Sequence, residues 1–262
     1  MSDTLISCKS IACGLLLAGL ALTSAAVPAY AEDWDNNSKV GSESEVLVGG
    51  TKDNRHEVIL NNKKYNTIIF GHAKNTNPEY IHEECSDYYY PTSAQYNVGV
   101  LPAGCSGTVI IGGKVASLQG SANNNTIIMQ SGSTLTADKD GQRYGGYLMQ
   151  PTFNGGCMYG GYGTKYASNS ADWLEVKNNT VIFKEGSSLK PEHYSHFAIH
   201  GGFSISKCAL ASYNKVLFEK GVNIPEEYAE LDVVGGMAIS TYESAKASGN
   251  YIGLNGGRFH WL

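Results

Sequence analysis

Polar and apolar positions alternate along this chain in short runs that share one pattern. An asparagine is followed two positions later by Ile or Val, and four positions later by Phe, Met or Leu. Residues i, i+2 and i+4 of a strand point to the same side, so each run offers one amide and two apolar side chains to a single face. The pattern predicts similar strands beginning at Asn66, Asn125, Asn179, Asn214 and Asn250, with a degenerate sixth copy at Asn97.

Glycines recur at regular distances from these asparagines. One follows at the seventh position after four of the five asparagines, at Gly132, Gly186, Gly221 and Gly257. Glycine pairs close three of the copies, at Gly145-Gly146, Gly201-Gly202 and Gly235-Gly236. We expect both kinds of glycine to lie at turns, where φ is positive or a side chain would clash.

An internal repeat of this length indicates an architecture in which successive units stack, because one unit cannot bury its apolar face alone. The repeat predicts an all-β fold, a right-handed parallel β-helix or solenoid with loop excursions. Stacked strands lie about 4.8 Å apart, which would let the asparagines pair amide to amide as a structural ladder. A β-sandwich or barrel of similar short strands is the alternative.

Composition divides the chain into three parts. Residues 1–31 are expected to be a signal peptide, because a short apolar stretch from Ile11 to Val27 precedes the small-residue site Ala29-Tyr30-Ala31. A membrane anchor is the alternative for this segment. We predict that residues 32–45 form a flexible lead and that residues 46–262 form the solenoid domain, with an insert near 72–96. No second long apolar segment exists, so we expect no transmembrane segment in the mature chain.

The charge balance argues against one class of partner. The chain has 24 acidic and 19 basic residues and a net charge of −5. This mildly acidic, scattered charge provides no basic surface of the kind that binds nucleic acid.

Four cysteines follow the expected signal peptide, at Cys85, Cys105, Cys157 and Cys208. An even number in an exported chain favours two disulfides, for which three connectivities are possible. We favour Cys85 with Cys105 and Cys157 with Cys208, since each pair brackets one insert or one repeat. Zinc is the alternative, although no Cys-x-x-Cys pattern supports it. We expect no metal and no cofactor.

Tyrosines concentrate in the insert and form the best candidate for ligand binding. The side chains concerned are Tyr80, Tyr88, Tyr89, Tyr90 and Tyr96. Tyrosine suits interfaces and stacking on sugars, and loops on a rigid scaffold are where binding usually resides. A second tyrosine group comprises Tyr144, Tyr147, Tyr159, Tyr162 and Tyr166. Either group could instead cover the flank of the solenoid or cap its end.

The sequence gives weaker evidence for catalysis than for ligand binding. The candidate carboxylates are Glu83, Glu84 and Asp87, then Asp138 with Asp140, and Glu226 with Glu227. Paired carboxylates could act as acid and base on a polysaccharide, but all of these lie in expected loops. The densest histidine group is His193, His196 and His200, which we interpret as exposed ladder residues beside a corner. We therefore assign no catalytic residue, and an enzymatic activity stays an open alternative.

The clearest strand unit runs from Asn178 to Gly186, and the clearest glycine corners are Tyr144-Gly145-Gly146-Tyr147, Tyr159-Gly160-Gly161-Tyr162 and His200-Gly201-Gly202-Phe203. Together they resemble the passenger repeats of bacterial autotransporters. The resemblance implies a secreted or surface-displayed β-helix, at the outer membrane or extracellular, that acts as an adhesin toward a host or neighbouring-cell glycan or protein. Those proteins end in a membrane barrel, which we do not expect here. A periplasmic location, a polysaccharide lyase or glycosidase, and a passive surface stalk are the alternatives.

Overall fold

The computed structural model describes residues 50–74, 92–116, 120–137, 155–164, 173–191, 195–224 and 229–255. The predicted signal peptide, the flexible lead and most of the insert lie outside these ranges. Every regular element within them is a strand, and every strand pairing is parallel. The prediction of an all-β chain with parallel strands is confirmed.

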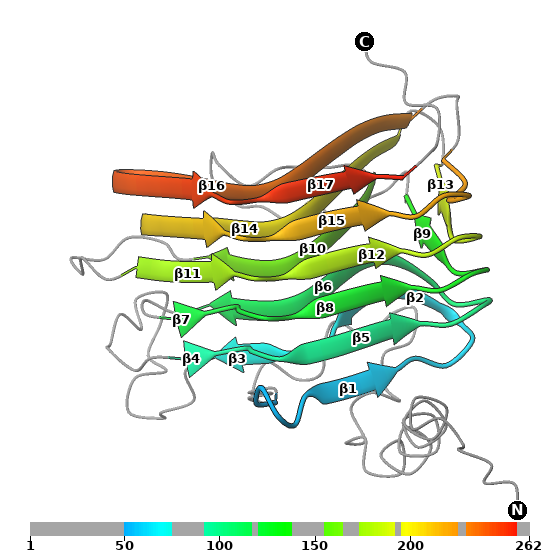
Figure 1. Ribbon diagram of the computed structural model, residues 1–262, viewed down its shortest axis with the longest axis horizontal. Coiled ribbons are helices and arrows are strands. Elements are labelled where there is room, and N and C mark those ends of the chain that lie inside the picture. Colours follow the sequence, from blue (N-terminus) through cyan, green and yellow to red (C-terminus); the bar gives the residue numbers. More distant parts are fainter. Residues whose placement is uncertain are drawn as a thin grey trace, which may run out of the picture.

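The smaller sheet has six strands and is built from the asparagine runs. Its order is β1-β5-β8-β12-β15-β17, so each strand lies beside the strand of the next repeat (Figure 1). The strands are β1 (His56–Ile59), β5 (Asn97–Leu101), β8 (Thr126–Met129), β12 (Thr180–Phe183), β15 (Lys215–Phe218) and β17 (Tyr251–Leu254).

The larger sheet has eleven strands. Eight of them follow the order β13-β9-β6-β10-β14-β11-β7-β4, while β16 lies beside β14, and β2 and β3 lie beside β6. Its short strands are β2 (Lys64–Ile69), β3 (His72–Lys74), β4 (Thr92–Ser93), β7 (Gly120–Ser121), β9 (Thr134–Thr136), β11 (Trp173–Lys177) and β13 (Ser188–Lys190). Its long strands are β6 (Ser106–Ala116), β10 (Gly155–Thr164), β14 (Ser195–Ser212) and β16 (Ala229–Ser248).

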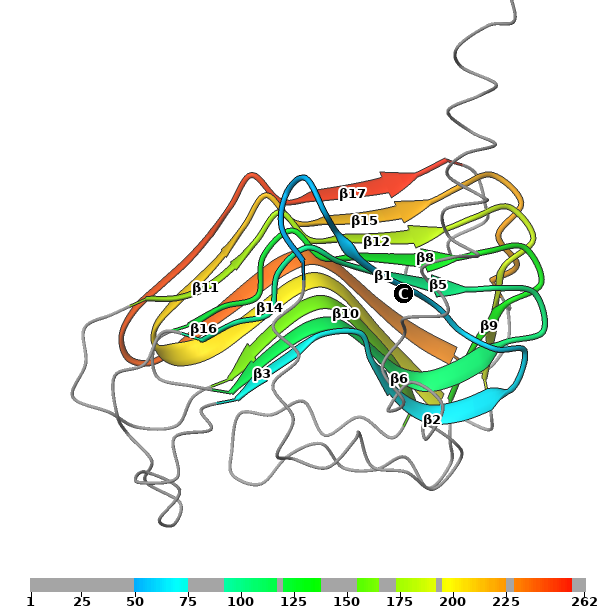
Figure 2. The same cartoon turned by 90° about the horizontal axis from the view of Figure 1, so that it is seen from below.

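The long strands bend in the middle, as Figure 2 shows for β10, β14 and β16. A glycine pair lies within each of them, and the second glycines are in register as Gly113, Gly161, Gly202 and Gly236. Each bent strand therefore changes direction at the same level as its neighbours, and the sheet bends as a unit.

The core is formed by the alternating inward residues of both sheets. In the smaller sheet Val181, Phe183, Val216 and Phe218 are fully buried, while their strand neighbours are half-buried or exposed. The rings of Phe183 and Phe218 stack with centroids 4.6 Å apart and planes 5° apart. In these two repeats, the aromatic side chain of one covers that of the next.

Truncating Phe183 should therefore be costly. We expect Phe183→Ala to lower the free energy of unfolding by about 3–5 kcal/mol, because it leaves a cavity beside the Phe218 ring. Ile182→Ala is the matched control, since Ile182 is adjacent but only half-buried. Denaturant unfolding followed by circular dichroism would measure both. Equal losses for the two variants would contradict this account of the core.

The asparagines at the start of the smaller sheet's strands form a continuous chain of amide hydrogen bonds. The Nδ2 group of Asn97 donates to Oδ1 of Asn125 at 2.7 Å, and Asn125 donates to Asn179 at 2.9 Å. Asn179 donates to Asn214 at 2.9 Å, and Asn214 to Asn250 at 3.2 Å. Each accepting oxygen also receives the backbone N–H of the preceding asparagine. We call these five residues the amide ladder.

The second amide proton of the ladder residues is also used. Asn125, Asn179, Asn214 and Asn250 donate it to the backbone oxygens of Ala94, Ala122, Val176 and Ala211, respectively. Every polar atom of the three central side chains is thereby paired, which removes the cost of burying them.

The predicted membership of the ladder is wrong at one position. Asn66 lies on β2, which pairs with β6 in the larger sheet, so it is not in line with the other asparagines. Asn97, the degenerate copy, takes that place. Before it, His56 occupies the same register, and its Nδ1 lies 2.9 Å from Oδ1 of Asn97. A histidine ring thus ends the described ladder on this side.

The two kinds of glycine have different roles. Gly104, Gly132, Gly186 and Gly221 all have φ between 78° and 87°, as predicted for turns seven residues after a ladder asparagine. The pairs Gly201-Gly202 and Gly235-Gly236 lie where the long strands bend (Figure 2) and where a side chain would clash, as predicted, but their φ is not positive; Gly145-Gly146 lies outside the described residues. The second glycines of the long-strand pairs pack against the ladder: a Cβ on Gly161 would lie 2.4 Å from Nδ2 of Asn179. Only hydrogen fits there.

Candidate functional site

Six segments outside the described residues interrupt the sheets along two lines. Residues 75–91, 117–119 and 165–172 follow Lys74, Ala116 and Thr164, which are in register at the ends of β3, β6 and β10. We call this the first attachment line. Residues 138–154, 192–194 and 225–228 leave after the short strands that align Thr134, Ser188 and Asn223, which we call the second attachment line. The long strands run between the two lines.

The outer face of these long strands is aromatic. A Cβ on Gly161 would meet Asn179, and one on Gly163 would lie 3.0 Å from Leu174, so both positions face the interior. Tyr162 lies between them and therefore points to the opposite, outer face.

Four rings gather on this outer face, and we call them the aromatic cluster: Tyr159, Tyr162, His200 and Phe203. Tyr162 and Phe203 are stacked with centroids 5.5 Å apart and planes 9° apart. Tyr159 lies 5.1 Å from Tyr162 and 5.3 Å from His200. These spacings are those of favourable aromatic pairs, and all four side chains are buried.

His200 is the unusual member of the cluster, and the prediction that it is exposed is wrong. Its side chain is 1% exposed, yet no described residue forms a hydrogen bond with either ring nitrogen. Its Nε2 lies 3.5 Å from Oδ2 of Asp232, which is too long for a good N–H···O bond. A buried imidazole without partners is costly, so His200 marks the least satisfied polar position of the face.

Burial keeps two groups near His200, the Tyr159 phenol and the Cys157 thiol, in their neutral protonated forms. Burial raises the pKa of Tyr159 well above its usual range, and Cys157, Tyr162 and Asp232 add to the rise. Burial alone raises the pKa of the Cys157 thiol from 9.0 to about 12. Because the thiolate is the nucleophile, this cysteine is unsuited to nucleophilic catalysis. The cluster therefore suits stacking and hydrogen bonding by neutral groups.

Cys157 also gives a prediction for alkaline pH. The pKa of its thiol is raised in the folded chain, so its contribution to stability is present below about pH 9 and is lost as the pH rises toward 12. Between pH 8 and 10 we expect the free energy of unfolding to fall by about 1 kcal/mol less in Cys157→Ala than in the wild type. Urea unfolding at both pH values measures this, and equal pH dependence would contradict it.

The predicted disulfides are not supported. Cys157 carries a free thiol, so it is not bonded to Cys208. Cys157 lies opposite Ala198 on β14, and Cys208 is ten residues further along that strand, up to about 33 Å of extended chain. Cys105 is likewise a buried free thiol, with its pKa raised to about 11 by burial, and Cys85 lies outside the described residues.

The predicted ligand-binding tyrosines are placed only in part. Tyr80, Tyr88, Tyr89 and Tyr90 lie outside the described residues, within the 75–91 segment of the first attachment line. Tyr96 is half-buried at a corner of the smaller sheet, where its φ is 56°. Asn124, Asn178, Tyr213 and Gly249 precede the other ladder asparagines with similar φ values, so Tyr96 serves as a corner residue. Its binding role stays a prediction.

The acidic candidates are not placed either. The three carboxylate groups, Glu83, Glu84 and Asp87, then Asp138 and Asp140, then Glu226 and Glu227, all lie outside the described residues. So does His193, while His196 lies on β14. Within the described ranges, no three His, Cys, Asp or Glu side chains are grouped so that they could hold a metal ion.

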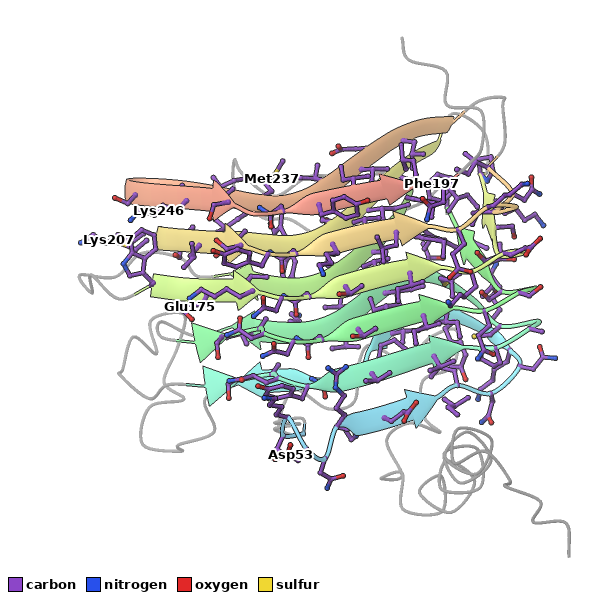
Figure 3. The ribbon with its side chains drawn as sticks, viewed as in Figure 1. Asp53, Glu175, Phe197, Lys207, Met237 and Lys246 are labelled. Carbon is purple, nitrogen blue, oxygen red and sulfur yellow. The ribbon has the colours of Figure 1, made fainter. Side chains whose placement is uncertain are left out.

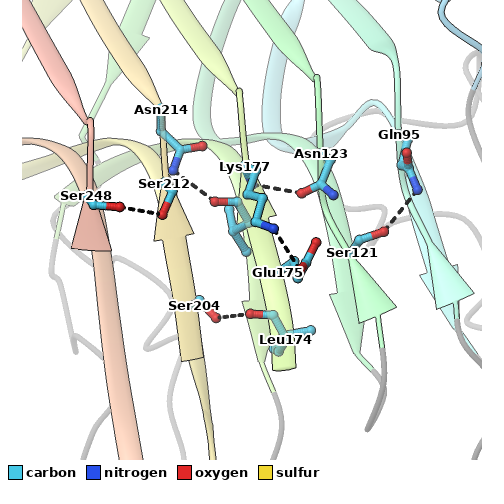
Figure 4. Close-up of polar contacts among 11 residues, drawn as sticks. Gln95, Ser121, Asn123, Leu174, Glu175, Lys177, Ser204, Ser212, Asn214 and Ser248 are labelled. Atoms are coloured by element: carbon cyan, nitrogen blue, oxygen red, sulfur yellow. Dashed lines mark hydrogen bonds and ion pairs between the residues drawn. The ribbon is translucent and has the colours of Figure 1, made fainter. Parts of the chain in front are cut away.

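One part of the larger sheet carries polar side chains that pair with one another (Figure 4). It is formed by β4, β7, β11 and the ends of β14 and β16. Gln95 donates to Ser121 at 2.9 Å, and the Ser212 and Ser248 hydroxyls lie 3.1 Å apart. At the same end, Lys246, which is labelled in Figure 3, lies over Trp173, with Nζ 5.0 Å from the ring centre. These groups largely satisfy each other, whereas neither ring nitrogen of His200 forms a hydrogen bond with a described residue, so the aromatic cluster is the stronger candidate although its rings are at most 5% exposed.

Sequence reasoning found Tyr159 and Tyr162 but did not bring them together with His200 and Phe203. The available signal was the shared corner pattern, in which an aromatic or histidine residue flanks the glycine pair on both sides. Register between β10 and β14 then pairs Tyr159 with His200 and Tyr162 with Phe203.

Two further observations concern membrane-spanning helices and similarity to known proteins. In the parts of the chain that the structure describes, no helix has the length and apolar character needed to cross a membrane. What the chain does must therefore be inferred from its own residues, because no protein-family model, curated protein or solved structure matches it.

Proposed function

We propose that this chain is an exported right-handed parallel β-helix of the autotransporter-passenger type, displayed at the cell surface or secreted. Its function is adhesion: it binds a glycan or protein of a host or neighbouring cell. The binding residues lie in the long segment inserted at the first attachment line, residues 75–91, and the stacked strands carry that segment.

The regular part of the molecule supports the scaffold role. Parallel strands, aligned asparagines and aligned glycines recur in each repeat, and each repeat contacts mainly its neighbours. Such a stack is rigid because its polar groups are paired along its length. A rigid stack can carry loops without changing its own core.

The proposal rests on one observation: the segments between corresponding strands of successive repeats differ in length. At the first attachment line, residues 75–91 separate β3 from β4, whereas only 117–119 separate β6 from β7, and β14 runs through the same level. Insertions are thus confined to fixed positions beside one face. Loops positioned by a rigid scaffold are the usual location of binding residues.

Protease treatment of intact producing cells, combined with fractionation, tests the location. We expect the chain to be cleaved on intact cells or recovered in the medium. Full protection inside a periplasmic fraction would overturn surface display, and would favour a polysaccharide-active enzyme instead.

A loop replacement tests the adhesive role. Residues 78–90 would be replaced by a short Gly-Ser linker, with the same replacement of residues 192–194 as the control. We expect the first variant to lose cell or glycan binding while its thermal unfolding stays within a few degrees of the wild type. Unchanged binding in the first variant would indicate a passive stalk.

A further inference from the structure

The repeat that ends the described part of the chain has a strand neighbour on one side only. Among the described residues, β16 pairs with β14 and β17 pairs with β15, and neither has a second partner. These two strands form the upper edge of the stack, where Met237 is also located (Figures 1 and 3). On the outer side of such an edge, no neighbouring strand among the described residues pairs with the backbone N–H and C=O groups.

The apolar side chains at this edge are placed as core residues but are not covered. Ile252 and Leu254 are in register with Val216 and Phe218, which are 0% exposed, yet both are 39% exposed. The same holds in the larger sheet, where Leu231 is half-buried although its register partner Phe197 is fully buried. The edge is therefore an open end of the hydrophobic core.

The amide ladder also stops here with unused donors. Asn97, Asn125, Asn179 and Asn214 each send a backbone N–H and an amide N–H to the next side-chain oxygen. Asn250 donates one amide proton to Ala211, and no described residue accepts its backbone N–H or its other amide proton. These two donors require one carbonyl oxygen, held at the same level on an added parallel strand.

We propose that this edge binds a parallel β-strand of a partner protein whose sequence has the form Asn-x-(Ile/Val)-x-(Phe/Leu). The asparagine oxygen accepts both donors of Asn250, and the two apolar residues cover Ile252 and Leu254. This is strand addition, in which main-chain bonds give affinity and alternate side chains give specificity.

The opposite end of the stack does not offer such a strand from a second copy. Val58, Leu60 and Tyr65, on or beside its outermost strands, are 6%, 5% and 0% exposed, so that end of the core is already covered. The open edge and the covered edge therefore do not match as the two halves of one interface.

The test uses a fluorescent peptide with the sequence of residues 212–224, which contains the β15 run, and the full chain. Fluorescence anisotropy should show saturable binding. A peptide carrying Asn214→Ala should bind about tenfold more weakly, because two hydrogen bonds are lost.

Two variants of the protein locate the site. Leu254→Lys should weaken peptide binding more than tenfold by burying a charge in the added contact. Ile59→Lys is the matched control, because Ile59 is 43% exposed on β1 at the other end of the smaller sheet. It should leave binding unchanged.

Several results would overturn the proposal. They are the absence of saturable binding, equal affinity of the two peptides, or equal binding by the Leu254→Lys variant. Self-association of the chain in sedimentation velocity that is abolished by Leu254→Lys, without peptide binding, would identify a second copy as the occupant and would also overturn it.

Discussion

Replacing Asn179 with alanine is expected to lower the free energy of unfolding by about 3–5 kcal/mol. The Asn179 side chain accepts two hydrogen bonds from Asn125 and donates two, to Ala122 and Asn214. Alanine removes all four and leaves buried donors and acceptors without partners on both neighbouring repeats. Urea unfolding followed by circular dichroism measures the loss.

Asn255 provides the control for this substitution. It is exposed and contributes a backbone N–H to the oxygen of Phe218, which alanine retains. We expect Asn255→Ala to change the free energy of unfolding by less than about 0.5 kcal/mol. A loss for Asn179→Ala that is no larger than this would show that the ladder does not stabilise the stack.

The second large effect is expected at Gly161. A Cβ there would lie 2.4 Å from Nδ2 of Asn179 and 2.8 Å from the backbone oxygen of Ala122. Neither atom can move without breaking the ladder, so we expect Gly161→Ala to cost about 3 kcal/mol or more. Thermal and denaturant unfolding would both report it.

A double-mutant cycle distinguishes this contact from a general intolerance of alanine in β10. Because Asn179→Ala removes the atoms that a new methyl group would meet, the two substitutions together should cost less than the sum of their separate losses by about 1 kcal/mol or more. Simple additivity would show that the glycine is not required by the asparagine.

Much of the strand pattern could be predicted from the sequence, because it follows from local chemistry. In four of the runs that begin with asparagine, the alternation places two apolar residues on one face, and these strands pair in parallel as expected. The turns seven residues later were also predictable, since a positive φ favours glycine wherever it occurs.

Asn66 shows where the same pattern misleads. Its run of Asn-Thr-Ile-Ile-Phe matches the others, but Ala73 stands where the repeat has glycine. Asn97 has the weaker run and the correct glycine, Gly104. The run that has glycine at the seventh position is the one that lies in the ladder, so glycine spacing was the better guide to it.

The contacts of the glycine pairs and of the aromatic cluster join residues whose separation along the chain differs from repeat to repeat. Gly113 contacts Asn125, twelve residues on, whereas Gly161 contacts Asn179, eighteen residues on, because segments of different length intervene. Only the register between strands brings such pairs together. The cysteine pairing failed for the same reason, since it was judged by order along the chain.

The amide ladder has an electrical direction. Every side-chain amide in it points its oxygen toward His56 and its N–H toward Asn250, because each donates to the next one in the same sense. The amide dipoles therefore add from one end of the stack to the other, and hydrogen bonds arranged in such chains polarise one another. Cutting the chain at Asn179 should thus weaken bonds on distant repeats, while cutting it at Asn250 should not. The repeats are coupled electrostatically along a line that the packing of the core alone would not provide.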